Sequence, residues 1–375
     1  MINRIIKNKI AKSIKPGMVI GLFGARRTGK TVLMDTLYEE MQHNRKILKV
    51  HGENLDIAEI LSSRRLSLLK GFLKGYNTLF IDEAQKIPNI GTNLKLIVDS
   101  LPETAVFVTG SSAFDLNKKI GEPLTGRGKN YMLFPFAQKE LEEDYITSKE
   151  NLPERLIFGL YPQVVLAEGK EEKVSLLESI KNGYLLRDIL ELDNLKDSLF
   201  ILNLLRLIAF QIGNDVSLSE LASTLQVNRK TVARYLELLE KTYIIFHHTG
   251  FSRNLRKEFT KSPRYYFWDN GIRNAIIMNF NTLNYRDDVG KLWENYCISE
   301  RKKMNHYRQR LVNYYFWRTY DQKEIDLIEE ADGKLSGFEM KWRHGKTKIP
   351  KEFLNTYKNS SFETITSDNY LEFIL

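Results

Sequence analysis

The sequence contains a single cysteine, Cys297, among its 375 residues. One cysteine excludes a disulfide within the chain and a cysteine-rich zinc site. The six histidines are scattered, and only His247 and His248 are adjacent, so no metal-ligand spacing such as HExxH appears. Any bound metal is therefore expected to be Mg²⁺, held by carboxylates and phosphate.

Long apolar runs are also missing. The longest, residues 200–210, is interrupted by Asn203 and Arg206 and is too short to span a bilayer. The amino-terminal residues are charged but lack an apolar stretch and a small-residue cleavage site, which argues against a signal peptide. We therefore expect a cytoplasmic protein that does not enter a membrane.

The composition is that of a globular protein with several domains. Hydrophobic residues make up 42% and charged residues 27%, which is enough to bury cores, and the length suggests two or three domains. Lys and Arg number 56 against 47 Asp and Glu, a net charge of +9. This excess permits a nucleic-acid partner but does not require one.

The order of expected elements divides the chain into three parts. Up to about residue 140, helices alternate with apolar strands predicted at 18–23, 46–50, 77–81, 104–109 and 130–134. Continuous apolar strands between helices indicate a parallel α/β sheet. The middle is helical, and strands return from residue 264, with a last one expected at 371–375. The predicted domains are 1–145, 146–265 and 266–375.

A phosphate-binding motif follows the first predicted strand. Residues 24–31 read GARRTGKT, which matches GxxxxGK[ST] between a strand and a helix. The glycines let backbone amides turn around a phosphate, and the helix adds its positive amino end. Lys30 would contact the β- and γ-phosphates, and the Thr31 hydroxyl would bind Mg²⁺. The predicted nucleotide-binding residues are Gly24, Ala25, Arg26, Arg27, Thr28, Gly29, Lys30, Thr31 and Val32. The first domain is thus predicted to have the P-loop NTPase fold.

Two further strands end in polar residues. The apolar run 78–81 is followed by Asp82 and Glu83, so Asp82 would hold Mg²⁺ through water and Glu83 would act as general base. A carboxylate beside the metal favours ATP hydrolysis over phosphorylation of a small molecule. The next strand ends near Thr109 and Ser111, either of which would orient the water. The alternative is a Ser/Thr-rich turn.

Arg127 lies in a glycine-flanked segment just before the fifth predicted strand. This placement suits an arginine finger that reaches the γ-phosphate bound by a neighbouring subunit, which would make the protein a homo-oligomer. The alternative is an ordinary surface arginine.

These motifs resemble those of the AAA-like ATPases of bacteria and archaea, and most closely a prokaryotic group often named archaeal-type ATPases. The resemblance rests on residues 24–31, 82–85, 109–112 and 125–127, and continues into a Gly-x-x-Pro segment at 158–165 and a Gly-x-x-x-Glu-Asn segment at 290–295. It covers nearly the whole chain and implies ATP and Mg²⁺ as ligands. Leu160 and Tyr161 stand where the group more usually has small residues.

Residues 217–239 show a helix-turn-helix pattern. Ser217 and Glu220 form a capping box, and a turn at 227–228 precedes a second helix. The basic stretch 251–264 resembles a wing, so we expect a winged helix. Its candidate DNA contacts are Arg229, Lys230, Arg234, Arg253, Arg256 and Lys257. The alternative is a winged helix that serves for packing or as a lid over the nucleotide.

The last part of the sequence carries acids in the order Glu294, Asp326, Glu339-x-Lys341. This order resembles the PD-(D/E)xK nuclease fold, in which such residues bind Mg²⁺ and activate water. Glu324 lies on the same strand face and is an alternative to Asp326. A charged hairpin, or a nuclease-like fold used for binding only, would explain the same residues.

The sequence therefore predicts a Mg²⁺-dependent ATPase with an α/β P-loop domain, a helical and winged-helix domain, and an α+β nuclease-like domain. Three functions remain open. The first is a DNA-associated ATPase, the second an ATP-regulated nuclease, and the third a signalling or scaffold ATPase that binds protein partners.

Overall fold

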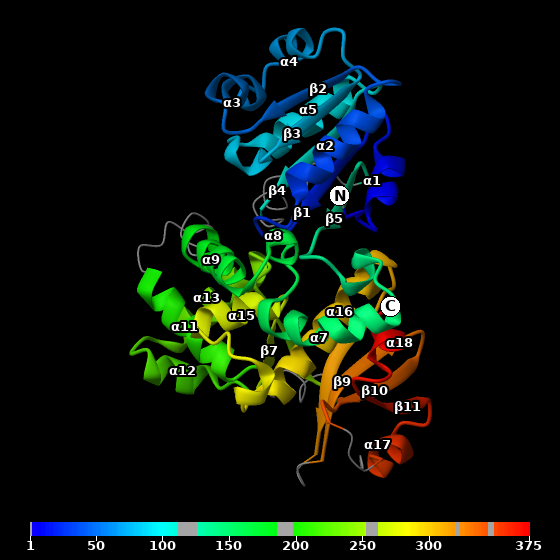
Figure 1. Ribbon diagram of the computed structural model, residues 1–375. Helices are drawn as coiled ribbons and strands as arrows, with labels where there is room; N and C mark the ends of the chain where they lie inside the picture. The colour runs from blue at the N-terminus through cyan, green and yellow to red at the C-terminus, as the bar shows by residue number, and fades with distance from the viewer. Residues whose placement is uncertain (1, 112–125, 186–197, 253–261, 320–322, 344–348) are drawn as a thin grey trace. The chain divides into compact units, whose positions relative to one another are not determined.

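A computed structural model describes residues 2–111, 126–185, 198–252, 262–319, 323–343 and 349–375 (Figure 1). The chain forms two compact units, Met1–Pro135 with Lys241–Tyr243, and Phe136–Glu240 with Ile244–Leu375. Among the described residues, no helix combines the length and apolarity needed to cross a bilayer. The three domain ranges from the sequence stay predictions.

The first unit is built on a parallel five-stranded sheet in the order β2-β3-β4-β1-β5. Its described strands are β1 (Val19–Phe23), β2 (Ile47–His51), β3 (Thr78–Asp82), β4 (Ala105–Gly110) and β5 (Gly128–Met132). Its helices are α1 (Lys7–Ser13), α2 (Lys30–Met41), α3 (Leu55–Ser62), α4 (Leu66–Phe72) and α5 (Ile90–Ser100). All five strands match the ranges predicted from the sequence within two residues, and the predicted parallel α/β sheet is confirmed.

Alternation along the central strands divides the core between two faces of this sheet. Leu79 and Ile81 of β3 pack in the cluster that α3, α4 and α5 cover. Phe80, between them, points to the other face, where its ring meets that of Tyr38 on α2 at 6.5 Å. Because both faces are covered by helices, each central strand reads as an uninterrupted apolar run.

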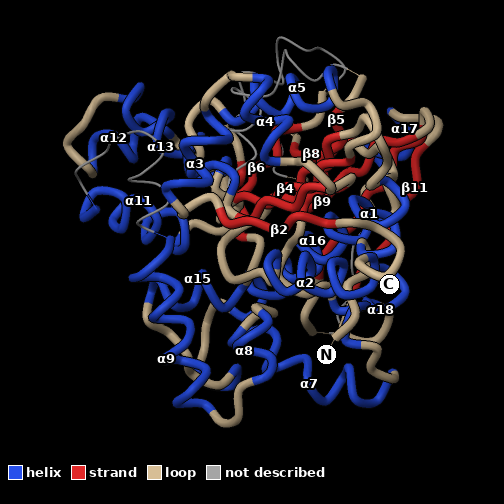
Figure 2. The backbone as a smooth tube through the Cα atoms, turned by 90° about the horizontal axis from the view of Figure 1, so that it is seen from above, coloured by secondary structure: helices blue, strands red, loops and turns tan. Residues whose placement is uncertain are grey.

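The second unit begins with a helical part. Its described helices are α7 (Tyr145–Phe158), α8 (Pro162–Leu166), α9 (Lys170–Ile180), α11 (Ser198–Phe210), α12 (Leu218–Thr224), α13 (Arg229–Lys241), α15 (Asn270–Ile277) and α16 (Val289–Tyr307). Figure 2 shows α7, α8, α9 and α15 gathered together. They share one apolar core with α11, α12 and α13. A π-helical turn, Lys181–Leu185, follows α9.

A mixed six-stranded sheet in the order β11-β10-β9-β8-β6-β7 completes the second unit. Its described strands are β6 (Ile245–Gly250), β7 (Arg264–Phe267), β8 (Asn313–Arg318), β9 (Glu324–Ala331), β10 (Lys334–Met340) and β11 (Ser360–Ile365), with the short helix α17 (Lys351–Thr356) before β11. Asp332 and Gly333 form the hairpin turn between β9 and β10, and both have positive φ, 51° and 73°.

The prediction of a strand at 371–375 is wrong, because these residues belong to the helix α18 (Tyr370–Ile374). Tyr370, Leu371, Phe373 and Ile374 are buried, a spacing that fits one helix face. A run of five mostly apolar residues carries too little periodicity to separate helix from strand. The packing of Tyr370 against Trp293 of α16, with ring centroids 5.4 Å apart, shows what this face covers.

The Gly-x-x-Pro segment has a structural explanation. Gly159 ends α7 with φ +70°, and a Cβ placed there would lie 2.1 Å from Asp269 Oδ1. Asp269 Oδ2 accepts a hydrogen bond of 2.6 Å from the Leu160 amide, and Oδ1 accepts one of 3.1 Å from the Ile272 amide at the start of α15. Pro162 then begins α8, where a missing N–H is tolerated. The segment therefore joins the end of α7 to the start of α15.

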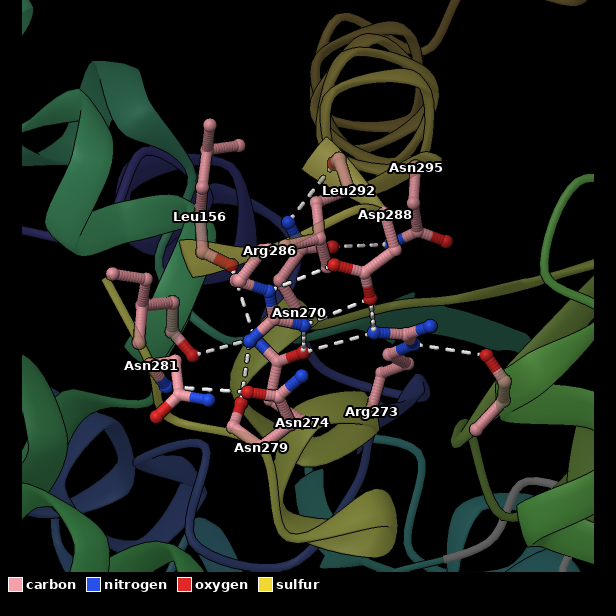
Figure 3. A network of polar contacts seen from close by, with 12 residues as sticks. Leu156, Asn270, Arg273, Asn274, Asn279, Asn281, Arg286, Asp288, Leu292 and Asn295 are labelled. Atoms are coloured by element: carbon pink, nitrogen blue, oxygen red, sulfur yellow. Dashed lines mark hydrogen bonds and ion pairs between the residues drawn. The ribbon is translucent and has the colours of Figure 1, made fainter. Parts of the chain in front are cut away.

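A buried ionic network holds the helices of the second unit together (Figure 3). Arg286 and Arg273 point toward Asp288 from two sides, and Arg286 Nε lies 2.8 Å from Asp288 Oδ1. Burial opposes the charge of Asp288, but hydrogen bonds from both arginines outweigh it and lower its pKa. Asn274 accepts from Arg286 at 2.9 Å and donates to the Ile157 carbonyl at 2.8 Å. The network thereby ties α15 to the end of α7.

Asn295, the last residue of the Gly-x-x-x-Glu-Asn segment, is fully buried on α16. Its side chain accepts from the Phe267 amide at 2.7 Å and donates to the Phe267 carbonyl at 3.0 Å. It also donates to Asn270 Oδ1 at 2.7 Å. One amide thus satisfies the backbone at the end of β7, so this part of the signature is structural.

Candidate nucleotide and carboxylate sites

The phosphate loop connects β1 to α2 at the carboxyl edge of the first sheet. Gly24 has φ +155°, and a Cβ there would lie 2.1 Å from the Leu133 carbonyl oxygen. Gly29 has φ +95° immediately before Lys30, the first residue of α2. Both positions need glycine, for close approach in one case and left-handed backbone in the other. The strand, loop and helix context that the motif requires is present.

Lys30 is buried within the loop that precedes it. Its Nζ donates to the carbonyl oxygens of Gly24 and Ala25, both at 2.9 Å. The Thr28 hydroxyl donates to the same Ala25 carbonyl at 2.9 Å. An ammonium group held over backbone carbonyls is already inside the loop that would surround a phosphate. Arg26 and Arg27 are partly exposed, and Val32 is half-exposed at the start of α2.

Three polar side chains meet beside this loop. The Thr31 hydroxyl donates to Asp82 Oδ2 at 2.8 Å, and the Thr109 hydroxyl donates to Asp82 Oδ1. They come from α2, β3 and β4, three elements that end or begin at the same edge of the sheet. A hydroxyl and a carboxylate oxygen in contact are ligand types that suit Mg²⁺. The structure therefore brings Thr31, Asp82 and Thr109 together beside the loop that holds Lys30, and their roles in binding and catalysis stay predictions.

Glu83 turns sharply out of β3. Its φ is +53°, and its amide donates to Asp82 Oδ1 at 3.1 Å and to Thr109 Oγ1 at 3.2 Å. Gly52 lies against this turn so closely that a Cβ there would be 2.4 Å from the Glu83 carbonyl oxygen. The left-handed backbone at Glu83 is thus fixed by its surroundings, as strained residues at functional sites usually are.

Two contacts near the loop were not anticipated from the sequence. Gln85 donates to the Glu83 carboxylate and to Ser111 Oγ, the latter at 3.2 Å. Arg4, before α1, donates to the Thr28 carbonyl at 2.8 Å and to the Phe134 carbonyl at 2.6 Å. Two signals for these contacts were present in the sequence, the place of Gln85 in the 82–85 box and the charged amino-terminal residues.

Arg127 lies at the opposite edge of the sheet. Strand β5 runs parallel to β1, with Gly128 opposite Val19, so Arg127 precedes the strand by one residue. Phe23, the last residue of β1 before the phosphate loop, lies about 16 Å further along the strand direction than Arg127, at 3.3 Å per residue. Arg127 is half-exposed and forms an ion pair with Asp99. Within this unit it does not meet Lys30 or Asp82, and a role toward a neighbouring subunit stays a prediction.

The predicted DNA contacts on α13 are exposed. Arg229, Lys230 and Arg234 all lie on its solvent side, whereas Val232 and Leu236 are buried. The Ser217 hydroxyl caps α12 by accepting from the Glu220 amide at 3.3 Å. The other three predicted contacts, Arg253, Arg256 and Lys257, lie outside the described residues, as does most of the expected wing. Its flanking strands β6 and β7 pair antiparallel, and β6 also pairs parallel with β8.

The C-terminal acids surround the ends of β9 and β10. Asp326 is buried and accepts from the Met340 amide at 2.8 Å. Burial and the nearby charge of Glu294 raise its pKa to about 7. Burial also raises the pKa of Glu294, whose carboxylate accepts from Tyr266 at 2.9 Å and from Lys291 at 3.1 Å. These carboxylates therefore influence one another electrostatically.

Glu339 and Lys341 lie beside this pair. Lys341 Nζ is 2.6 Å from Glu339 Oε1, while Glu339 Oε2 is buried without a hydrogen-bond partner among the described residues. Burial, together with the charge of Asp326, raises the pKa of Glu339. Glu324 instead bonds to Arg264 at 2.9 Å. Across the described parts of the chain, no three His, Cys, Asp or Glu side chains are placed so that they could hold a metal ion as they stand.

Family comparisons assign the first part of the chain. Residues 17–142 match an AAA domain family. Residues 149–283 and 289–369 match two domains of unknown function, DUF8612 and DUF4143. The predicted AAA-like P-loop domain is therefore confirmed, and its sheet is that of a P-loop NTPase.

The chain also resembles uncharacterized proteins over most of its length. One, from Mycobacterium tuberculosis, is 26% identical over 89% of this chain and 72% of its own. Another, from Methanocaldococcus jannaschii, is 23% identical over 98% and 88%. Neither name indicates a function.

Among solved structures, the replication initiator DnaA bound to AMPPCP and single-stranded DNA matches with a TM-score of 0.32 and 13% identity. It covers 63% of this chain and 86% of that one. Cdc6p from Pyrobaculum aerophilum matches with a TM-score of 0.29 and 14% identity, over 73% and 90%. At these TM-scores the likeness is too remote to assign a function.

Proposed function

We propose that this protein binds ATP with Mg²⁺ at the phosphate loop and hydrolyses it. The observation that carries the proposal is the contact of Thr31 with Asp82, joined by Thr109, directly beside a loop that holds the Lys30 ammonium. These groups come from three separate elements, and their convergence at the carboxyl edge of a parallel sheet is where such folds bind nucleotides.

Each side chain has a distinct role in this proposal. Lys30 exchanges the Gly24 and Ala25 carbonyls for phosphate oxygens, which a cation binds more strongly. Thr31 and Asp82 are the groups that would hold Mg²⁺, which neutralises phosphate charge. Glu83 accepts a proton from the attacking water. In a homo-oligomer, Arg127 would act on the γ-phosphate held by the next subunit.

ATP turnover in the presence and absence of Mg²⁺ tests the proposal. We expect turnover with Mg²⁺ and its loss when EDTA is added, because Asp82 and Thr31 supply no positive charge of their own. Phosphate release that is insensitive to EDTA would contradict the assignment, and so would the absence of any turnover.

We further propose that residues 146–265 and 266–375 engage DNA. Arg229, Lys230 and Arg234 present three positive charges on one exposed helix surface, as phosphate contacts require. Replacing all three with alanine should weaken duplex binding and reduce the slope of log K against log salt by roughly 2 to 3.

A matched control for this change is available on the first unit. Lys70, Lys74 and Lys95 are exposed, so replacing these three removes the same net charge from another surface. The control should leave the salt slope nearly unchanged. Equal losses in both triple variants would indicate a general charge effect. Weak binding with little salt dependence in the unmodified protein would instead favour a scaffold or signalling ATPase that binds protein.

An ATP-regulated nuclease is the second candidate. It is favoured by the mutual repulsion of the buried Asp326 and Glu294 carboxylates and by the buried, unpartnered Glu339 Oε2, which a bound cation would relieve. Lys341 next to Glu339 would contact the scissile phosphate. We expect Mg²⁺-dependent nicking of plasmid DNA that Asp326→Asn and Lys341→Ala each abolish. Nicking that persists in both variants would exclude this site.

A further inference from the structure

Gln85 connects the predicted general base to a neighbouring strand. It lies in the short 3-10 helix Ala84–Lys86 that follows Glu83. One hydrogen bond runs from its Nε2 to Glu83 Oε2, and another runs 3.2 Å from Nε2 to Ser111 Oγ. Ser111 is buried just after β4. Both hydrogens of the side-chain amide therefore have acceptors. One acceptor, Glu83, directly follows β3, and the other, Ser111, directly follows β4.

The orientation of this amide is determined by its neighbours. A carboxylate is only an acceptor, so turning the amide over would place Gln85 Oε1 against Glu83 Oε2 and replace attraction by repulsion. In the observed orientation Oε1 is buried and has no hydrogen-bond partner among the described residues. A buried carbonyl oxygen without a partner lowers stability, and a native chain retains one only where another interaction requires it.

We infer that Gln85 is a positioning residue for hydrolysis, whose amide, with Ser111, holds the Glu83 carboxylate in the orientation it needs to accept a proton from water. This inference rests on the proposed ATP hydrolysis at the same site. The Glu83 backbone is already fixed by its positive φ and by Gly52, but its side chain has three rotatable bonds. The hydrogen bond from Gln85 removes that freedom before the reaction begins.

Gln85→Met separates positioning from a structural role. Methionine has a similar length and volume but no amide, so it removes both the bond to Glu83 and the unpartnered oxygen. We expect a turnover number lower by about tenfold, a KM for ATP within about twofold of the original, and an unchanged or higher melting temperature. Ser111→Ala should lower the turnover number in the same direction by a smaller factor. Gln42→Met, at an exposed glutamine after α2, is the matched control.

A double-mutant cycle with Glu83→Gln provides a readout that packing alone would not change. Because Gln85 acts through Glu83, adding Gln85→Met to Glu83→Gln should reduce residual single-turnover hydrolysis no further. A fully multiplicative loss, or a lowered melting temperature in Gln85→Met, would overturn the inference. If Gln85→Met turned over ATP normally while Glu83→Gln did not, the role of Gln85 would be refuted and the proposed function would stand. The absence of Mg²⁺-dependent turnover in the unmodified protein would refute the proposed function itself.

Discussion

Replacing Lys30 with methionine should reduce Mg²⁺-dependent ATP turnover by at least about a hundredfold, since removing one preorganised charge from a reacting group has effects of this size. Lys30 is the only residue at the start of α2 whose positive charge lies inside the phosphate loop, within 2.9 Å of two of its carbonyl oxygens. Methionine keeps most of the side-chain volume, so the loop should remain packed. The measurement is steady-state phosphate release, together with nucleotide affinity.

The control for this variant is Lys95→Met, which removes a lysine from the exposed side of α5. It should leave turnover and nucleotide affinity within experimental error. Thermal unfolding of both variants should stay close to that of the original protein. In Lys30→Met the loss of two hydrogen bonds is offset by the removal of a buried charge. Turnover that survives Lys30→Met would show that ATP is hydrolysed elsewhere in the chain.

Asp326→Asn should stabilise the protein at neutral and alkaline pH. Burial raises the pKa of Asp326 from 3.8 to about 7, so the folded protein favours the protonated carboxyl. This contribution to stability is complete below the unfolded pKa and is lost as pH rises through about 7. A shift of this size corresponds to at most roughly 4 kcal/mol of unfolding free energy. Asparagine resembles the protonated form and retains an oxygen that can accept from the Met340 amide.

Chemical denaturation at several pH values checks this prediction. At about pH 8 the variant should be more stable than the original protein, and near pH 4 the two should converge. Glu363→Gln, at an exposed position on β11, should produce no such difference. Greater destabilisation at pH 8 than at pH 4 would mean that the Asp326 carboxylate is stabilised when charged. If the nuclease proposal holds, the same variant is more stable and inactive, as expected when function retains an unfavourable buried charge.

The phosphate loop was predictable because its information is local. Glycine spacing, one lysine and one threonine between an apolar strand and a helix specify the backbone conformation, and the structure places Gly24, Gly29, Lys30 and Thr31 accordingly. The parallel sheet was predictable for a related reason. Strands covered on both faces are apolar throughout, and this can be recognised in the sequence of each strand separately.

Local information failed where a short segment carried an ambiguous pattern. The five residues of α18 were expected to be a strand because their periodicity is too short to interpret. The Gly-x-x-Pro and Glu-Asn segments were recognised from the sequence only as a family resemblance, and the structure shows that Gly159 and Asn295 serve the packing of α7, β7 and α15. The role of Gly159 depends on Asp269, and that of Asn295 depends on Phe267. In each pair the two residues are far apart in the sequence.

The sequence alone thus determined that the chain has a P-loop, an acidic strand end and an AAA-like α/β domain. Only the tertiary structure decided that Gln85 links Glu83 to Ser111, that Arg4 contacts the phosphate loop, and that Arg127 lies at the far edge of its sheet. The physical reason is the range of the interactions. A motif is set by backbone conformations within a few residues, whereas these pairings depend on strand order and on the close packing of segments far apart in the chain.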